Sequence, residues 1–334
     1  MNIMNKRLSL ILFLSLVATI VPAQVMKVGI IGLDTSHSTA FTRLINSNDQ
    51  AYQDFKVVAA YPYGSRTIES AYSRIPKYTE EVKEYGVTVV SSIAELLDMV
   101  DCVLLETNDG QVHLDQAAEV FKAGKKVYID KPIGATLAQA IAIFELAERY
   151  GVTTFSSSAV RFTELNQEIR AGKHGEVLGA DCYSPHHPEA SHPDFGYYGL
   201  HGVEELYTVM GTGCKEVSRV HTPSGDVVSG IWEGGKIGSF RAIVEGPGAY
   251  GGRVLTERGV FETGGYTGYK PLVEAILNFF RTGICPIDKE ETLEIFTFME
   301  ASNLSLEKGG KMVPLEKIRS KAEKEARRLL RGIN

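Results

Sequence analysis

The sequence lacks the charge balance of a nucleic-acid-binding protein. Its 35 Lys and Arg residues are outnumbered by 41 Asp and Glu residues, so the net charge is -6 and the pI is about 5.8. This composition gives no basic surface that would attract a polyanion. The expected partner is therefore a small molecule, and nucleic acid is not among the predicted partners.

The sequence also has few cysteines and no apolar run long enough for a membrane span. Its 4 cysteines are far apart, so they show none of the close pairs of zinc sites and assign no disulfide. Cys102 lies in an apolar strand pattern and is expected to be buried. The apolar stretch at residues 8–21 is shorter than the roughly 20 residues that a spanning helix requires.

Residues 1–23 have the layout of a secretory signal peptide. Two basic residues, Lys6 and Arg7, precede the apolar stretch, and Val21 and Ala23 occupy the −3 and −1 positions of a cleavage site. We predict cleavage near Ala23, a mature chain without stable membrane insertion that starts near Gln24, and export to the periplasm or secretion. The alternative is an uncleaved membrane anchor.

Between residues 24 and 152, short apolar runs alternate with helical patterns. Strands are predicted at residues 26–32, 56–61, 87–90, 101–106, 126–129 and 152–156, and helices at 38–45, 93–99, 113–123 and 137–150. Such alternation is typical of an α/β fold with a parallel sheet and right-handed crossovers. Residues 24–152 are therefore predicted to form a Rossmann-type dinucleotide-binding domain.

The second half of the chain changes in character. Strands separated by turn residues are predicted at residues 177–184, 216–221, 227–232, 236–243 and 252–262, and helices at 200–210, 270–281 and 315–331. The hairpin-like spacing favours a mostly antiparallel open sheet. We predict that residues 153–334 form an α+β domain for substrate binding and oligomerisation.

The turn after the first strand departs from the Gly-x-Gly-x-x-Gly pattern of pyrophosphate loops. Those glycines let backbone N–H groups and the helix N-terminus approach the phosphates. Only Gly32 remains, because Asp34 takes the second glycine position and His37 the third. Asp34 either opposes the phosphates or faces away and caps the helix, as Thr35 and Ser36 also can.

The end of the second strand bears on the choice between NAD and NADP. No Asp or Glu stands there to bind the ribose hydroxyls. Ser65 and Arg66 follow closely and are suited to a 2′-phosphate, which favours NADP. NAD remains the alternative, as does a cofactor that is tightly bound or absent.

Four stretches, in order, resemble the Gfo/Idh/MocA family, which includes glucose–fructose oxidoreductase and inositol 2-dehydrogenase. They are residues 28–32, the turn Thr107-Asn108 followed by His113, the triplet Asp130-Lys131-Pro132 in place of Glu-Lys-Pro, and the helix that begins at residues 199–201. The resemblance extends over about residues 26–307 and implies an exported, divergent member of the family.

The resemblance assigns candidate catalytic roles to Lys131 and His201. In the family the lysine contacts nicotinamide and substrate, while the histidine is the acid/base for a sugar hydroxyl. His titrates near neutral pH, and an ammonium stabilises a developing oxyanion. His201 also lies off the apolar stripe of the predicted helix. Tyr197, a third candidate, stands where the family usually has Asp.

The cofactor-binding candidates combine the glycine turn, the end of the second strand and the family motifs. They are Gly32, Asp34, Thr35, Ser36, His37, Ser65, Arg66, Thr107, Asn108, His113, Asp130, Lys131 and Pro132.

Half of the 8 histidines lie between residues 186 and 201. His201 and Glu205 are spaced i, i+4, which can present two ligands to one metal. The spacing of His186, His187 and His192 matches no metal signature, so we predict no metal and a polar loop that covers the site.

These observations favour an NAD(P)-dependent oxidoreductase acting on a sugar, sugar derivative or cyclitol. The altered glycine turn and Tyr197 support an alternative, a non-redox lyase or hydrolase for a keto sugar, with or without a metal. A ligand-binding relative without catalysis is the third hypothesis. Export weakens the first, because free NAD(P) is scarce outside the cytoplasm. The resemblance also implies a homodimer or homotetramer.

Overall fold

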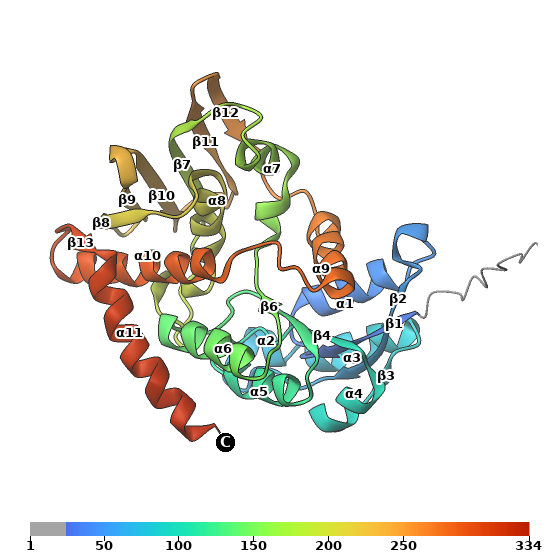
Figure 1. Cartoon of the computed structure of the whole chain (residues 1–334). Helices are drawn as coiled ribbons and strands as arrows, with labels where there is room; N and C mark the ends of the chain where they lie inside the picture. The colour runs from blue at the N-terminus through green and yellow to red at the C-terminus, as the bar shows by residue number, and fades with distance from the viewer. Residues whose placement is uncertain (1–24, 334) are drawn as a thin grey trace, which may run out of the picture.

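The computed structural model describes residues 25–333, which form two layered parts (Figure 1). The predicted signal peptide, residues 1–23, and the predicted first mature residue, Gln24, lie outside the described residues. Within 25–333, no helix combines the length and the apolar character needed to cross a membrane.

The N-terminal part is built on a six-stranded sheet in which every neighbouring pair is parallel. The strand order is β3-β2-β1-β4-β5-β6. The strands are β1 Met26–Ile31, β2 Phe55–Tyr61, β3 Thr88–Val89, β4 Cys102–Leu105, β5 Lys126–Ile129 and β6 Thr154–Phe155. The order 3-2-1-4-5-6 is that of a Rossmann fold, so the predicted fold class is confirmed.

Two helical layers cover this sheet because alternate strand residues point to opposite faces. One layer contains α4 (Ile93–Met99), α5 (His113–Lys122) and α6 (Leu137–Arg149). The other contains α1 (Ser36–Ile45), α3 (Ile75–Glu84) and α9 (Lys270–Thr282). Helix α9 comes from the second half of the chain, and Figure 1 shows it beside α1.

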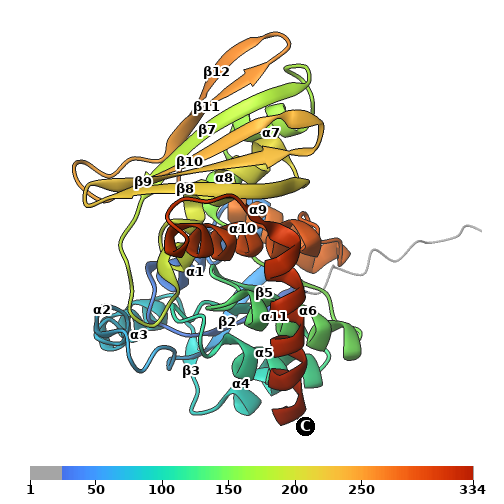
Figure 2. The same ribbon diagram turned by 90° about the vertical axis from the view of Figure 1, so that its left-hand side faces the viewer.

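The second part contains a seven-stranded sheet, ordered β12-β11-β7-β10-β9-β8-β13, that stands above the first (Figure 2). Only β7 and β10 pair in parallel; the other neighbours are antiparallel, as predicted. The strands are β7 Val177–Pro185, β8 Cys214–Thr222, β9 Gly225–Trp232, β10 Ile237–Ile243, β11 Gly251–Thr256, β12 Gly259–Thr263 and β13 Val313–Pro314. The prediction of one strand over 252–262 was wrong, because a turn at Glu257 and Arg258 divides it into a hairpin.

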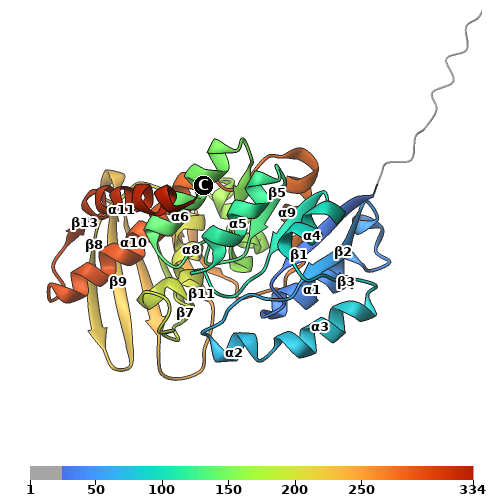
Figure 3. The same ribbon diagram turned by 90° about the horizontal axis from the view of Figure 1, so that it is seen from below.

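Several helices were not predicted from the sequence. They are α2 (Glu69–Tyr72), α3, α7 (Glu164–Arg170) and α10 (Lys289–Glu307). Helix α10 packs between the second sheet, α6 and α11 (Leu315–Leu329), with buried residues around most of its circumference. A helix buried on several sides has no single apolar stripe to reveal it. Figure 3 shows α10 and α11 beside α6, viewed from below.

Helix α8 (Leu200–Met210) is buried far more than its sequence pattern indicated. Glu204, Glu205 and Thr208 lie off the predicted apolar stripe, yet all three are buried. The helix is enclosed by the second sheet on one side and by the segment after β6 and α7 on the other. The helix is therefore buried on more faces than its apolar stripe alone.

All four cysteines are free. Cys102 is 1% exposed, as predicted.

The burial of Glu205 generates a prediction about pH and stability. Burial raises the pKa of this fully buried carboxyl to about 7, even though Thr263 and Asn166 lower it. In the unfolded chain the carboxyl has its ordinary pKa of 4.5. Below pH 4.5 the carboxyl is neutral in both the folded and the unfolded chain, and its burial does not oppose folding. As the pH rises above 4.5 and through about 7, the unfolded chain ionises first, and the free energy of unfolding falls.

We expect Glu205→Gln to be more stable than the wild type by about 3 kcal/mol at pH 8, with most of the difference gone at pH 5. Urea denaturation at the two pH values measures the difference. Glu84→Gln, at an exposed position, is the matched control and should show no such change. An equal effect of Glu205→Gln at both pH values would show that the burial argument is wrong.

Candidate active site

A cavity of about 180 Å³ lies where the carboxyl edge of the first sheet meets the second part of the chain. Its lining residues are Thr35, Ser36, His37, Arg74, Asn108, Lys131, Ser158, Ala159, Val160, Tyr197, Tyr198, His201, Tyr250, Tyr266 and Tyr269. Ligands of open α/β sheets bind at this edge, and the boundary between two parts of a protein is a common place for small-molecule sites.

Lys131 and His201 line the same cavity although they come from different parts of the chain. Lys131 follows β5, whose carboxyl end lies beside that of β4 and at the same edge of the sheet as that of β1. His201 is the second residue of α8. The structure thus brings together the two residues to which the sequence analysis assigned catalysis.

The imidazole of His201 is held in one orientation. Its Nδ1 lies 2.6 Å from Ser158 Oγ and shares a hydrogen bond with it. Burial, together with the positive charges of Lys131 and His37, lowers the pKa of His201 well below its usual value. The ring is therefore neutral near pH 7, and in the tautomer whose Nδ1–H donates to Ser158, Nε2 can take a proton from a ligand.

Tyr197 also lines the cavity. Its Oη accepts a hydrogen bond of 2.6 Å from Asn108 Nδ2, so the phenolic hydrogen remains free to donate. Burial raises the pKa of Tyr197, so the phenol stays protonated near neutral pH. The residue that replaces the family's usual Asp is thus a hydrogen-bond donor.

Asp34 does not cap α1. Thr35 is the N-cap, and its Oγ1 accepts from the backbone N–H of His37. The carboxylate of Asp34 instead accepts from the backbone N–H groups of Ser65 at 2.6 Å and Asn108 at 3.0 Å, and the residue is 0% exposed. Asp34 therefore joins the loops that follow β1, β2 and β4.

The loop after β2 packs directly on the glycine turn. The N–H groups of Gly32 and Leu33 donate to the carbonyls of Tyr61 and Pro62. A Cβ at Gly64 would lie 2.4 Å from a carboxylate oxygen of Asp34, so only glycine allows this approach. In a Rossmann fold the adenosine half of a dinucleotide lies near the end of the second strand, which is where this loop begins.

One of the two residues predicted to bind a 2′-phosphate has other hydrogen-bond partners. Ser65 is buried, its hydroxyl donates to Asp109 Oδ2 at 3.2 Å, and it accepts from the N–H of Ile68. The expectation that this hydroxyl faces a phosphate was wrong. Arg66 is exposed.

The cavity is lined by residues suited to one end of a dinucleotide. Thr35, Ser36, Asn108 and Lys131 line the cavity and suit the nicotinamide end of such a cofactor. Asp34, whose turn would face the pyrophosphate, is buried and accepts hydrogen bonds from the loops after β2 and β4. The cavity, at about 180 Å³, is also below the range of about 300–1,000 Å³ that is usual for cofactor-sized ligands.

The remaining cofactor candidates have structural contacts of their own. Thr107 Oγ1 donates to Gln116 Oε1, and the ring of His113 bonds the carbonyls of Thr107 and Ile133. Gly32 has φ +91°, and a Cβ there would lie 2.6 Å from the backbone of Thr107. The others, Asp130 and Pro132, are buried beside the cavity and do not line it.

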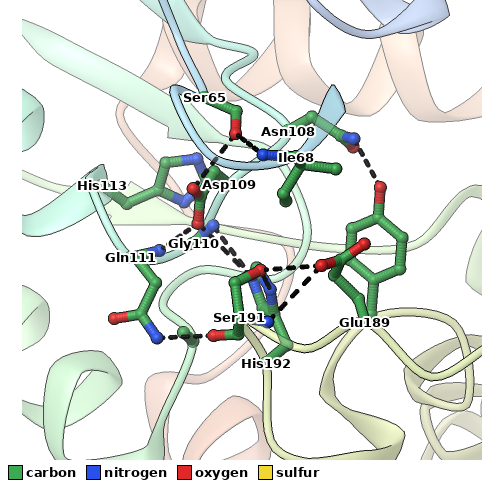
Figure 4. Close-up of polar contacts among 12 residues, drawn as sticks. Ser65, Ile68, Asn108, Asp109, Gly110, Gln111, His113, Glu189, Ser191 and His192 are labelled. Carbon is green, nitrogen blue, oxygen red and sulfur yellow. Dashed lines mark hydrogen bonds and ion pairs between the residues drawn. The ribbon is translucent and has the colours of Figure 1, made fainter. Parts of the chain in front are cut away.

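The histidine-rich loop before α8 binds to the loop after β4 (Figure 4). The N–H of Gly110 donates to His192 Nε2 at 3.1 Å, and Gln111 Nε2 donates to the carbonyl of Ser191 at 2.6 Å. Burial lowers the pKa of His192 to about 4, so this acceptor stays neutral. The loop therefore covers the edge of the first sheet.

The four histidines of residues 186–201 do not meet at one point. His186 pairs with Asp194, His187 is exposed, and His192 and His201 have the separate partners given above. Glu205 accepts from Asn166 and does not approach His201, so the i, i+4 spacing builds no common site.

The sequence analysis missed several residues at the site. Ser158, Arg74 and three tyrosines at positions 250, 266 and 269 line the cavity from loops or helices that it did not assign. It also missed Glu106, which follows β4 and lies, fully buried, beside His37 and Asp130. The acidic residue at the end of an otherwise apolar strand was the available signal.

Comparisons with known proteins agree with this architecture. Residues 26–158 match the model of the Gfo/Idh/MocA oxidoreductase family, NAD-binding Rossmann fold. The match lies in the N-terminal part of the chain and covers less than half of its length. An uncharacterized oxidoreductase of Escherichia coli (strain K12), YhhX, is 26% identical over 154 residues, which are 42% of this chain and 45% of that protein. The match thus spans less than half of the relative's length.

Solved structures share the fold at low sequence identity. A probable dehydrogenase from Thermotoga maritima superposes with a TM-score of 0.72 and 17% identity, over 88% of this chain and 100% of that one. The scyllo-inositol dehydrogenase of Lactobacillus casei, with bound NAD(H) and scyllo-inositol, gives a TM-score of 0.69 and 15% identity over the same shares. At such identities the likeness establishes the fold.

The position of Asp34 generates a prediction about stability. Asp34→Ala removes the acceptor for two backbone N–H groups that are then buried without a partner. We expect the free energy of unfolding to fall by about 2–4 kcal/mol. Chemical denaturation measures the loss, with exposed Arg66→Ala as a control that should change little. A loss below about 0.5 kcal/mol would contradict the assigned role of Asp34.

Proposed function

We propose that this protein is an NAD(P)-dependent oxidoreductase that acts on a sugar, sugar derivative or cyclitol, with Lys131 and His201 handling the proton of a substrate hydroxyl. One observation carries the proposal: the two groups, from different parts of the chain, line one small cavity at the ligand-binding edge of a Rossmann sheet. The matches to the NAD-binding oxidoreductase family support it.

The roles follow from the contacts of the three residues. His201, neutral and held by Ser158, accepts the hydroxyl proton at Nε2. The Lys131 ammonium stabilises the charge that develops on the oxygen, and the free phenolic hydrogen of Tyr197 adds a donor. These residues account for the proton and the oxygen of the substrate hydroxyl, and an NAD(P) cofactor, when bound, would accept the hydride.

The cavity wall favours a polar ring with a neutral or negative substituent. Five tyrosines line it, and their amphipathic rings suit a sugar or cyclitol. Arg74 and Lys131 supply positive charge, and no Asp or Glu is among the lining residues. A sugar acid therefore suits this wall better than a cationic amino sugar.

The loop beside Asp34 favours a second candidate function. A lyase or hydrolase acting on a keto sugar needs a base for the proton next to the carbonyl and a cation for the enolate oxygen, and no dinucleotide. His201 and Lys131 are suited to both roles. A relative that binds a sugar without catalysis is the outcome if neither reaction occurs.

The pocket residues generate the first test. Lys131→Met and His201→Ala should each lower turnover of a sugar or keto-sugar substrate about 10²–10⁴-fold, the usual loss for a positioned acid/base. His187→Ala is the matched control, because His187 is exposed on the loop before α8 and does not line the cavity. Circular dichroism checks the fold. Full activity of either pocket variant would refute the assignment.

Nucleotide binding separates the two candidate functions. Native mass spectrometry of purified protein and calorimetry with NAD⁺ and NADP⁺ are the measurements. Bound nucleotide, or a dissociation constant in the micromolar range, supports the oxidoreductase. No nucleotide binding, together with His201-dependent deuterium exchange next to the carbonyl of a keto sugar, would replace it with the non-redox function. Tighter binding of NADP⁺ would support the role of Arg66.

We also propose that the protein is exported and forms a dimer or tetramer. The layout of residues 1–23 supports export, and N-terminal sequencing of protein from its host tests it. The outward face of the second sheet supports assembly, because it exposes apolar side chains such as Ile237, Leu255 and Val260. Light scattering of wild type and Ile237→Lys tests whether that face is the interface.

A further inference from the structure

A compact cluster of three buried side chains lies directly beside the cavity. It consists of His37 at the start of α1, Glu106 after β4 and Asp130 after β5. His37 Nδ1 lies 2.8 Å from Asp130 Oδ2 and 3.9 Å from Glu106 Oε2. One ligand atom from each residue falls within 4.8 Å of the others.

Glu106 has no partner that explains its burial. The residue is 0% exposed, and neither of its carboxyl oxygens has a hydrogen-bond partner in the structure. An ionised carboxylate in such a place is unfavourable unless a cation or a proton neutralises it.

The spacing of the three atoms suits one metal ion. Nitrogen and oxygen ligands lie about 2.0–2.2 Å from a bound Zn²⁺. Two ligands of the same ion are therefore about 3–4 Å apart. The measured separations of 2.8 Å and 3.9 Å need only small side-chain adjustments to meet this condition.

Two of the three groups are held in position by other contacts. Asp130 Oδ1 accepts from the N–H of Lys131 at 2.8 Å and from Tyr128 Oη at 3.4 Å, which leaves Oδ2 facing His37. The His37 ring stacks on Phe41 and meets the edge of Tyr269. Supporting contacts of this kind orient the ligands of metal sites.

We propose that His37, Glu106 and Asp130 bind one divalent transition-metal ion, Zn²⁺ or Mn²⁺, at the wall of the cavity. Two carboxylates and one imidazole suit these ions, and the imidazole disfavours Mg²⁺ and Ca²⁺. Because His37 lines the cavity, an open coordination position on that side is accessible to water or to a substrate oxygen. The site itself does not depend on the proposed function.

The test uses untagged, full-length protein freed of metal by dialysis against a chelator. Calorimetry with ZnCl₂ and with MnCl₂, and elemental analysis of protein purified without chelator, measure binding. We expect one ion per chain with a dissociation constant in the micromolar range or below. Glu106→Gln and Asp130→Asn should each weaken binding at least 100-fold.

Glu205→Gln is the matched control, because it removes a buried carboxylate far from the cluster, next to Asn166. It should bind the metal like the wild type. Glu106→Gln keeps the side-chain shape and removes a buried carboxyl that has no hydrogen-bond partner, so its unfolding temperature should not fall. If it falls, His37→Gln, at the cavity wall, provides the same binding test.

The proposal is overturned if the wild type binds neither ion stoichiometrically, or if the cluster variants bind as tightly as Glu205→Gln. The visible spectrum of the Co²⁺-loaded protein gives a further readout, since its absorption should change in Glu106→Gln and not in Glu205→Gln. None of these measurements uses a substrate, so a negative result leaves the tests of Lys131 and His201 intact.

Discussion

The geometry of the candidate site depends on one buried cation, Arg161. Its side chain is almost fully buried and donates to Glu204 of α8 at 2.7 Å and to Glu291 of α10 at 2.6 Å. Glu204 also accepts from the N–H of Ser158 at 2.9 Å and from the hydroxyl of Ser157. Buried charges persist only when they are paired and hydrogen-bonded, and this network meets that condition. It thereby holds His201, which lies on the same helix as Glu204 and bonds Ser158, against the first domain.

Asp34 imposes a second constraint, at the opposite side of the cavity. In a Rossmann fold the turn after the first strand is kept small so that phosphates can approach the backbone. Here the turn carries a carboxylate that accepts hydrogen bonds from the loops after β2 and β4. The same contacts tie together three loops at the carboxyl edge of the sheet. The domain thus keeps the strand order of a Rossmann fold, with a carboxylate in the turn where glycines usually lie.

The cavity and the cluster behind it have opposite charge. Arg74 and Lys131 face the cavity, while Glu106 and Asp130 lie buried behind its wall. His37 belongs to both, since its ring lines the cavity and its Nδ1 faces Asp130. A neutral base, a cation and a buried acidic pair therefore lie within one small region at this edge of the sheet. That combination suits the removal of a proton from a hydroxyl or from a carbon next to a carbonyl.

The sequence by itself determined the sheet of the first domain, because alternating apolar runs and helical patterns report burial that is local in the chain. It also pointed to Lys131 and His201 through their places after a strand and at the start of a helix. Only the tertiary structure decided the partners of Asp34 and Glu106, because these lie on strands and loops far away in sequence. Helix α10 was not predicted for a related reason. It is buried on several sides, so its sequence shows no periodic apolar stripe. Local patterns record which face of an element is buried, whereas contacts between distant segments arise only when the two parts of the chain pack together.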